Sequence, residues 1–84
     1  MEITALLTGN RRGVNTSSPK ALLINIEGFN RKHCWVDITK QLAKLQPAGH
    51  QRPIKVRITA KVKEYLKRGV EPQQTIIVED IQRI

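Results

Sequence analysis

Hydrophobic and polar residues alternate most strictly over residues 54–65, IKVRITAKVKEY. Successive side chains of an extended chain point to opposite faces, so one face of this segment is apolar. That face carries Ile54, Val56, Ile58, Ala60 and Val62. The other face carries Lys55, Arg57, Thr59, Lys61, Lys63 and Tyr65. This period of two predicts a strand with one buried face and one basic face.

Shorter apolar or alternating segments predict four further strands, over residues 2–8, 21–27, 31–38 and 74–84. Turn-forming residues separate them: 9–20 reads as a long polar loop, 28–30 as a turn and 66–73 as a hairpin loop. In the third strand, one face carries Cys34, Val36 and Ile38, and the opposite face carries Arg31, His33, Trp35 and Asp37.

The spacing of Ile38, Leu42 and Leu45 predicts a short helix over residues 39–46. Asp37 or Thr39 is expected to cap its start, and Pro47 to end it. The predicted order is β-β-β-α-β-β in a single domain of residues 1–84, which is all-β with one short helix. A small five-stranded, closed or partly closed barrel is expected, because closure protects the strand edges.

Charge points to the kind of partner. The chain has 15 Lys and Arg against 7 Asp and Glu, a net charge of +8. Such an excess favours a polyanion such as DNA, RNA or an anionic membrane surface, although a merely soluble basic protein is the alternative. The first residues lack a signal peptide's basic region, and no apolar segment has the length of a membrane span. A cytoplasmic protein without a membrane partner is expected.

The segment IKVRITAKVKEYLKRG, followed by TIIVEDIQRI, resembles the last two strands of OB-fold single-stranded-DNA-binding and primosomal replication proteins of bacteria. Residues 76–81, IIVEDI, carry the clearest likeness, and the resemblance lies mainly in residues 54–84. The chain departs from the family pattern at Thr59 and Ala60, where a glycine is usual, and in its few aromatic residues. The resemblance implies a small OB-like barrel that binds single-stranded DNA or RNA without catalysis.

Cations and aromatic side chains supply the candidate binding residues. Same-face cations of the basic strand lie about 6.6–7 Å apart, close to the spacing of successive phosphates. Basic pairs in the two expected rim loops could clamp phosphates, and aromatic side chains could stack on bases. The predicted nucleic-acid-binding residues are Arg11, Arg12, Arg31, His33, Trp35, Lys55, Arg57, Lys61, Lys63, Tyr65, Lys67 and Arg68. For each, the alternative is structural: a solvated cation or a packed aromatic ring.

The sequence offers little for catalysis, metal binding or a cofactor. Ser17 and Ser18 lie in a polar loop with no histidine beside them, as a nucleophilic site would require. His33 and Cys34 are adjacent in a strand and point apart, so they cannot bind one ion together. We therefore expect a protein that is not an enzyme and holds no metal or cofactor.

Two other functions fit the same composition. A protein-interaction adaptor or inhibitor, of the kind phages and plasmids encode, would dock its basic surface on an acidic or nucleic-acid-binding partner. Association with a duplex or a ribosome would use the same charge. The last strand also has apolar residues on both faces, Ile76 and Val78 against Ile77 and Ile81, which indicates a homodimer contact or a covering element.

Overall fold

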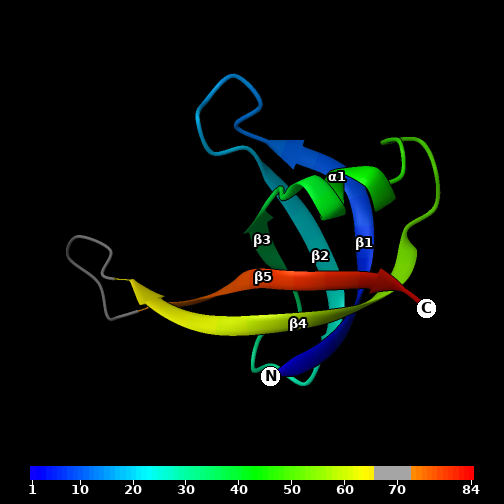
Figure 1. Cartoon of the computed structure of the whole chain (residues 1–84). Coiled ribbons are helices and arrows are strands. Elements are labelled where there is room, and N and C mark those ends of the chain that lie inside the picture. Colours follow the sequence, from blue (N-terminus) through cyan, green and yellow to red (C-terminus); the bar gives the residue numbers. More distant parts are fainter. Residues whose placement is uncertain (66–72) are drawn as a thin grey trace.

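The strands and the helix follow the alternating and helical patterns of the sequence. A computed structural model describes residues 1–65 and 73–84 (Figure 1). The elements are β1 (Glu2–Arg12), β2 (Lys20–Glu27), β3 (Cys34–Asp37), α1 (Lys40–Leu45), β4 (Ile54–Tyr65) and β5 (Gln73–Arg83). All strand pairs are antiparallel, in one sheet of order β3-β2-β1-β4-β5. The predicted mainly-β class and element order are confirmed.

The curvature of the sheet brings its two outermost strands together. Residues of β3 and β5 approach to within 8 Å between Cα atoms. The inward side chains of all five strands form one apolar core, in which Leu7, Leu23 and Ile58 are fully buried. Cys34 and Val36 are buried in it, as the alternation of the third strand predicts. The prediction that Val62 is buried in the core is wrong, because its side chain is 43% exposed. The end of β4 and the start of β5 extend beyond the other three strands (Figure 1).

Strand β1 is longer than the predicted 2–8 and includes the first part of the expected loop. A bulge allows the extension: Leu7 lies opposite Leu23, but Arg11 lies opposite Ala21, so β1 has two extra residues there. Thr8 supplies hydrogen bonds that the irregular ladder lacks. Its Oγ1 donates to the carbonyl of Leu22 (2.8 Å) and accepts from the amide of Asn10 (3.2 Å).

Strand β3 is shorter than the predicted 31–38. Asn25, with φ of 51°, forms a bulge in β2, and the ladder between β2 and β3 begins only at Leu23 and Cys34. The intervening residues form a turn in which Gly28 takes a φ of 92°, a conformation that favours glycine. Arg31 and His33 therefore precede the strand and do not belong to its outward face.

Helix α1 begins and ends close to its predicted limits. Of the two candidate caps, Thr39 is the N-cap, and its Oγ1 accepts a hydrogen bond from the amide of Leu42 (3.1 Å). Leu42 is fully buried and attaches the helix to the core, with Leu45 packed beside it. Among the residues that the structure describes, no helix has the length and apolar character needed to cross a membrane.

A third bulge, in β5, explains the apolar residues on both faces of the predicted last strand. Asp80 lies opposite Thr59 and Val78 opposite Ala60, so Glu79 is an extra residue in β5. The bulge reverses the alternation and turns Ile81 inward, where it is 5% exposed. Ile77 alone of the four remains outward, at 41% exposure. The bulge therefore accounts for the apolar residues on both faces of the strand without a second copy of the chain. The homodimer remains a prediction.

Candidate nucleic-acid interface

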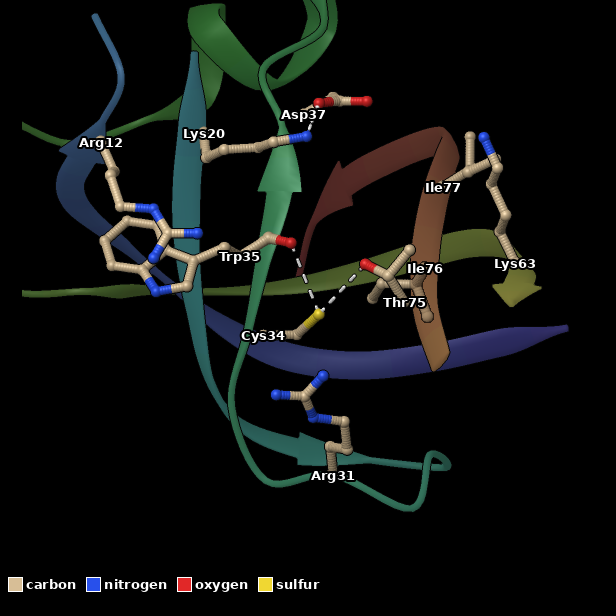
Figure 2. Close-up of a pocket in the computed structure, with 10 residues that line it drawn as sticks. All are labelled: Arg12, Lys20, Arg31, Cys34, Trp35, Asp37, Lys63, Thr75, Ile76 and Ile77. Carbon is tan, nitrogen blue, oxygen red and sulfur yellow. Dashed lines mark hydrogen bonds and ion pairs between the residues drawn. The ribbon is translucent and has the colours of Figure 1, made fainter. Parts of the chain in front are cut away.

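A cleft of about 570 Å³ lies between the outer strands β3 and β5, near the end of β1 and the start of β2 (Figure 2). Its walls are formed by Arg12, Lys20, Arg31, Cys34, Trp35, Asp37, Lys63, Thr75, Ile76 and Ile77. Four of these side chains are cations and one is a carboxylate. The cleft is therefore electropositive, with an aromatic ring and two isoleucines among its polar groups.

Trp35 provides the aromatic surface of the cleft. It lies opposite Leu22 on β2, and its neighbours in β3, Cys34 and Val36, are buried, so the indole faces away from the core. The guanidinium of Arg12 lies over the ring, 4.7 Å from its centroid (Figure 2). This cation–π contact brings a charge from the end of β1 directly onto the aromatic face.

Lys20 and Asp37 form an ion pair at the same edge of the cleft. They lie opposite each other on β2 and β3, which places both side chains on one face of the sheet. Their side chains are 35% and 61% exposed, so solvent screens the attraction and the pair contributes little to stability.

Arg31 comes from the loop before β3 and ties that loop to β5. Its Nη1 donates to the carbonyl of Gln74 (3.2 Å), and Asn30 donates to the Gln74 side chain (3.3 Å). Nearby, the Sγ of the buried Cys34 lies 3.7 Å from the Oγ1 of Thr75. These contacts join the two outer strands at the cleft, and they fix Arg31 there although it is not in a strand.

Lys63 is the member of the basic strand face that reaches the cleft. It lies opposite Thr75, which also lines the cleft, close to the end of β4 (Figure 2). The cations on the basic face of β4 therefore do not all lie at one site. Lys63 belongs to the cleft, and its predicted companions lie elsewhere on the strand.

The remaining cations of the strand, Lys55, Arg57 and Lys61, form what we call the outer face of β4. All three are exposed, but acidic side chains interrupt the row. Glu2 and Asp80 lie on either side of Thr59, in β1 and β5. In addition, Lys61 is 3.6 Å from the carboxylate of Glu79. The row is thus divided between Arg57 and Lys61.

Arg11 points away from the cleft, unlike its neighbour Arg12. Its Nε donates to the side-chain oxygen of Gln46 (2.8 Å), and the side-chain Nε2 of Gln46 donates to the carbonyl of Thr8 (3.0 Å). Gly9 allows this approach, since a Cβ at that position would lie 2.4 Å from the carbonyl oxygen of Ala48. The last part of β1, which ends at Arg12, is thus packed against the end of α1 and the segment that follows it.

The other predicted binding residues are not part of the described cleft. His33 is exposed in the loop before β3 and does not line it. Lys67, Arg68 and the side chain of Tyr65 lie outside the described residues. Within the part of the chain that the structure describes, His, Cys, Asp and Glu side chains form no group of three that could hold a metal ion.

Sequence reasoning missed Lys20 and Asp37 as cleft residues. A usable signal was present, since Lys20 precedes the apolar run 21–27 and its parity is opposite to that of the inward Ala21. Asp37 likewise shares the parity of Trp35. The hydrophobic pattern does not predict that β2 pairs with β3, and it is this pairing that places Lys20 opposite Asp37.

The arrangement suits a ligand that is both flat and anionic. The indole and the guanidinium of Arg12 that lies over it are both planar groups on which a base can stack, and the guanidinium and ammonium groups of the cleft can bind phosphate oxygens. Comparison of the chain with protein-family models, with curated proteins and with solved structures gives no match.

Proposed function

We propose that this protein binds single-stranded nucleic acid, DNA or RNA, in the cleft and does not catalyse a reaction. The observation that carries the proposal is the position of one outward aromatic ring, Trp35, among four cationic side chains. Phosphate contacts supply most of the affinity of non-specific binding, and stacking on aromatic rings supplies a sequence-tolerant addition. Both kinds of contact are available within one cleft.

A single strand fits this combination better than a duplex. Bases in a duplex are stacked on one another, so their flat faces are not free to meet an indole. A duplex would instead need a broad surface of cations for its phosphates. The outer face of β4 is the nearest such surface, and Glu2, Asp80 and Glu79 interrupt it.

The proposal includes the fold: a small OB-like barrel, as the resemblance of residues 54–84 implies. Three features support it, namely the strand order β3-β2-β1-β4-β5, the approach of β3 to β5 and a helix between the third and fourth strands. In an OB-type barrel the loop after the first strand and the loop between the last two strands flank the binding groove. Arg12 and Lys63 approach the cleft from the strands that lead into those two loops.

The test is a titration with a fluorescein-labelled single strand and with a duplex of equal length, at several salt concentrations. We expect tighter binding of the single strand, quenching of the emission of Trp35 and an affinity that falls with salt. The chain has one Trp, so the emission reports on the cleft alone. Equal binding of the duplex without quenching would contradict the cleft proposal. Absence of binding at low salt would contradict nucleic-acid binding and favour the adaptor hypothesis.

A further inference from the structure

The cleft contains an anion of its own. Asp37 is the one carboxylate among its described lining residues, and it is paired with Lys20. Asp37 does not cap α1, because Thr39 takes that role. With the described residues, its carboxylate makes no hydrogen bond other than the one to Lys20. The side chain is 61% exposed, so it is free to leave the lysine without unfolding its surroundings.

A carboxylate and a phosphate compete for the same kind of donor. The ammonium group of lysine is a compact charge with three donors and no preference for a planar partner, so either anion satisfies it. A phosphate that binds Lys20 must displace Asp37 or accept a like charge beside it. Either outcome lowers the free energy gained from the contact.

We propose that Asp37 is an intramolecular competitor of the nucleic-acid phosphate for Lys20, and that it limits both the affinity of the cleft and its dependence on salt. This inference rests on the proposed function. Lys20 then contributes fully only to a strand that is already held by Arg31 and Lys63, since such a strand presents its next phosphate at a high local concentration. Asp37 thereby favours oligonucleotides over single nucleotides.

The chain provides a matched pair for the test. Lys61 and Glu79 also join a lysine of one strand to an acid of its neighbour, with side chains 72% and 41% exposed, but neither residue lines the cleft. Glu79→Gln and Asp37→Asn each remove one negative charge and release one lysine. The two variants remove the same charge, and the released lysine faces the proposed ligand in one of them and not in the other.

The experiment measures binding of a labelled single strand to the wild-type protein and both variants over a range of salt. For Asp37→Asn we expect an affinity about two- to fivefold higher at low salt, the scale of an exposed ion pair. The log–log salt slope should become steeper by up to about 0.7, because one more phosphate contact is fully made. For Glu79→Gln we expect less than about a twofold change and an unaltered slope.

A Lys20→Met background separates local competition from a general change of charge. There, Asp37→Asn should lose its advantage over Glu79→Gln, because no lysine remains to be released. Equal effects of the two acid variants in the wild-type background would overturn the inference, and so would weaker binding by Asp37→Asn. If the wild-type protein and both variants all fail to bind at low salt, the proposed function itself is overturned.

Discussion

The cleft and the outer face of β4 have similar numbers of cations but differ in what lies across the neighbouring strands. In the cleft, Arg31 and Lys63 come from separate elements and face a common space. On the outer face of β4, the cations share one strand, yet Glu2 and Asp80 lie beside them in the adjacent strands. The difference teaches that a basic strand becomes an electropositive surface only when its sheet neighbours leave it uncompensated.

The sequence pattern alone draws attention to the other member of this comparison, the outer face of β4. Alternation along residues 54–65 displays four cations in a row, whereas the cleft cations are spread from Arg12 to Lys63. A strand's own period fixes the face on which its side chains lie. It says nothing about the residues of other strands on that face, which decide the local charge.

We expect the largest difference between the cleft and the outer face of β4 when the cations of each region are removed and single-strand binding is measured. Replacing Lys20, Arg31 and Lys63 together with Gln should weaken single-strand binding by about 10²- to 10³-fold at low salt, with about tenfold for each charged contact. The salt slope should become shallower by about 1.4 to 2, since the contacts of Arg31 and Lys63 are lost in full and that of Lys20, which Asp37 limits, in part. Anisotropy titrations at several salt concentrations measure both quantities.

The matched variant replaces Lys55, Arg57 and Lys61 with Gln and loses the same three charges. We expect about a threefold loss or less, because exposed charges far from the ligand are screened by salt. Comparable losses in the two variants would show that net charge governs binding and would remove the distinction between the regions.

The aromatic surface is the second way to sharpen the comparison, because the outer face of β4 has no described counterpart to Trp35. Trp35→Ala should weaken single-strand binding by about tenfold, within the range of stacking on one base, and leave the salt slope unchanged. Trp35→Phe keeps a flat ring and should retain most of the affinity. If Trp35→Ala binds like the wild type, the ring has only a packing role.

Gly9 packs closely against the segment after α1, and it lies in the strand that ends at Arg12. Gly9→Ala places a Cβ 2.4 Å from the carbonyl oxygen of Ala48, so the two backbones must separate. We expect a loss of about 1–3 kcal/mol in the free energy of unfolding, measured by urea titration, and an affinity lowered a few-fold. Gly49→Ala is the control, since its nearest atom would lie at 3.9 Å, and it should change neither.

The smallest expected effect leaves binding untouched. Thr39→Ala removes the side chain that caps α1 and should lower the free energy of unfolding by about 1 kcal/mol, or about 4–8 °C in the melting temperature. Thr39→Ser keeps the capping oxygen and should restore most of the loss. The affinity for a single strand should stay the same in both, because α1 does not line the cleft.

Local patterns predicted most of the fold. The limits of β4 agree with the predicted 54–65, and those of α1 lie one residue inside the predicted 39–46, because strict periods and a capping threonine specify them. The ends of β1 and β3 differ from prediction for one shared reason. Bulges at Thr8–Asn10 and at Asn25 change the register, and a bulge has no signature in hydrophobic periodicity.

The candidate site was predicted in part. Arg12, Arg31, Trp35 and Lys63 come together in the cleft as charged or aromatic residues of the predicted set. Lys20 and Asp37 were missed, because their roles follow from a cross-strand contact and not from a motif. Arg11 differs from Arg12 in its direction because Gln46 binds it, a contact that spans 35 residues of sequence.

The extra residue in β5 has a consequence for changes in chain length. Removing Glu79 would restore an unbroken alternation in which Ile76, Val78 and Ile81 still face inward, whereas removing Ile77 would exchange inside and outside for everything on one side of the gap. A bulge bends its strand. Glu79 therefore affects the direction in which β4 and β5 run, but it does not change which residues of β5 are buried. Shortening the strand there would re-aim Lys63 while keeping every buried residue in place.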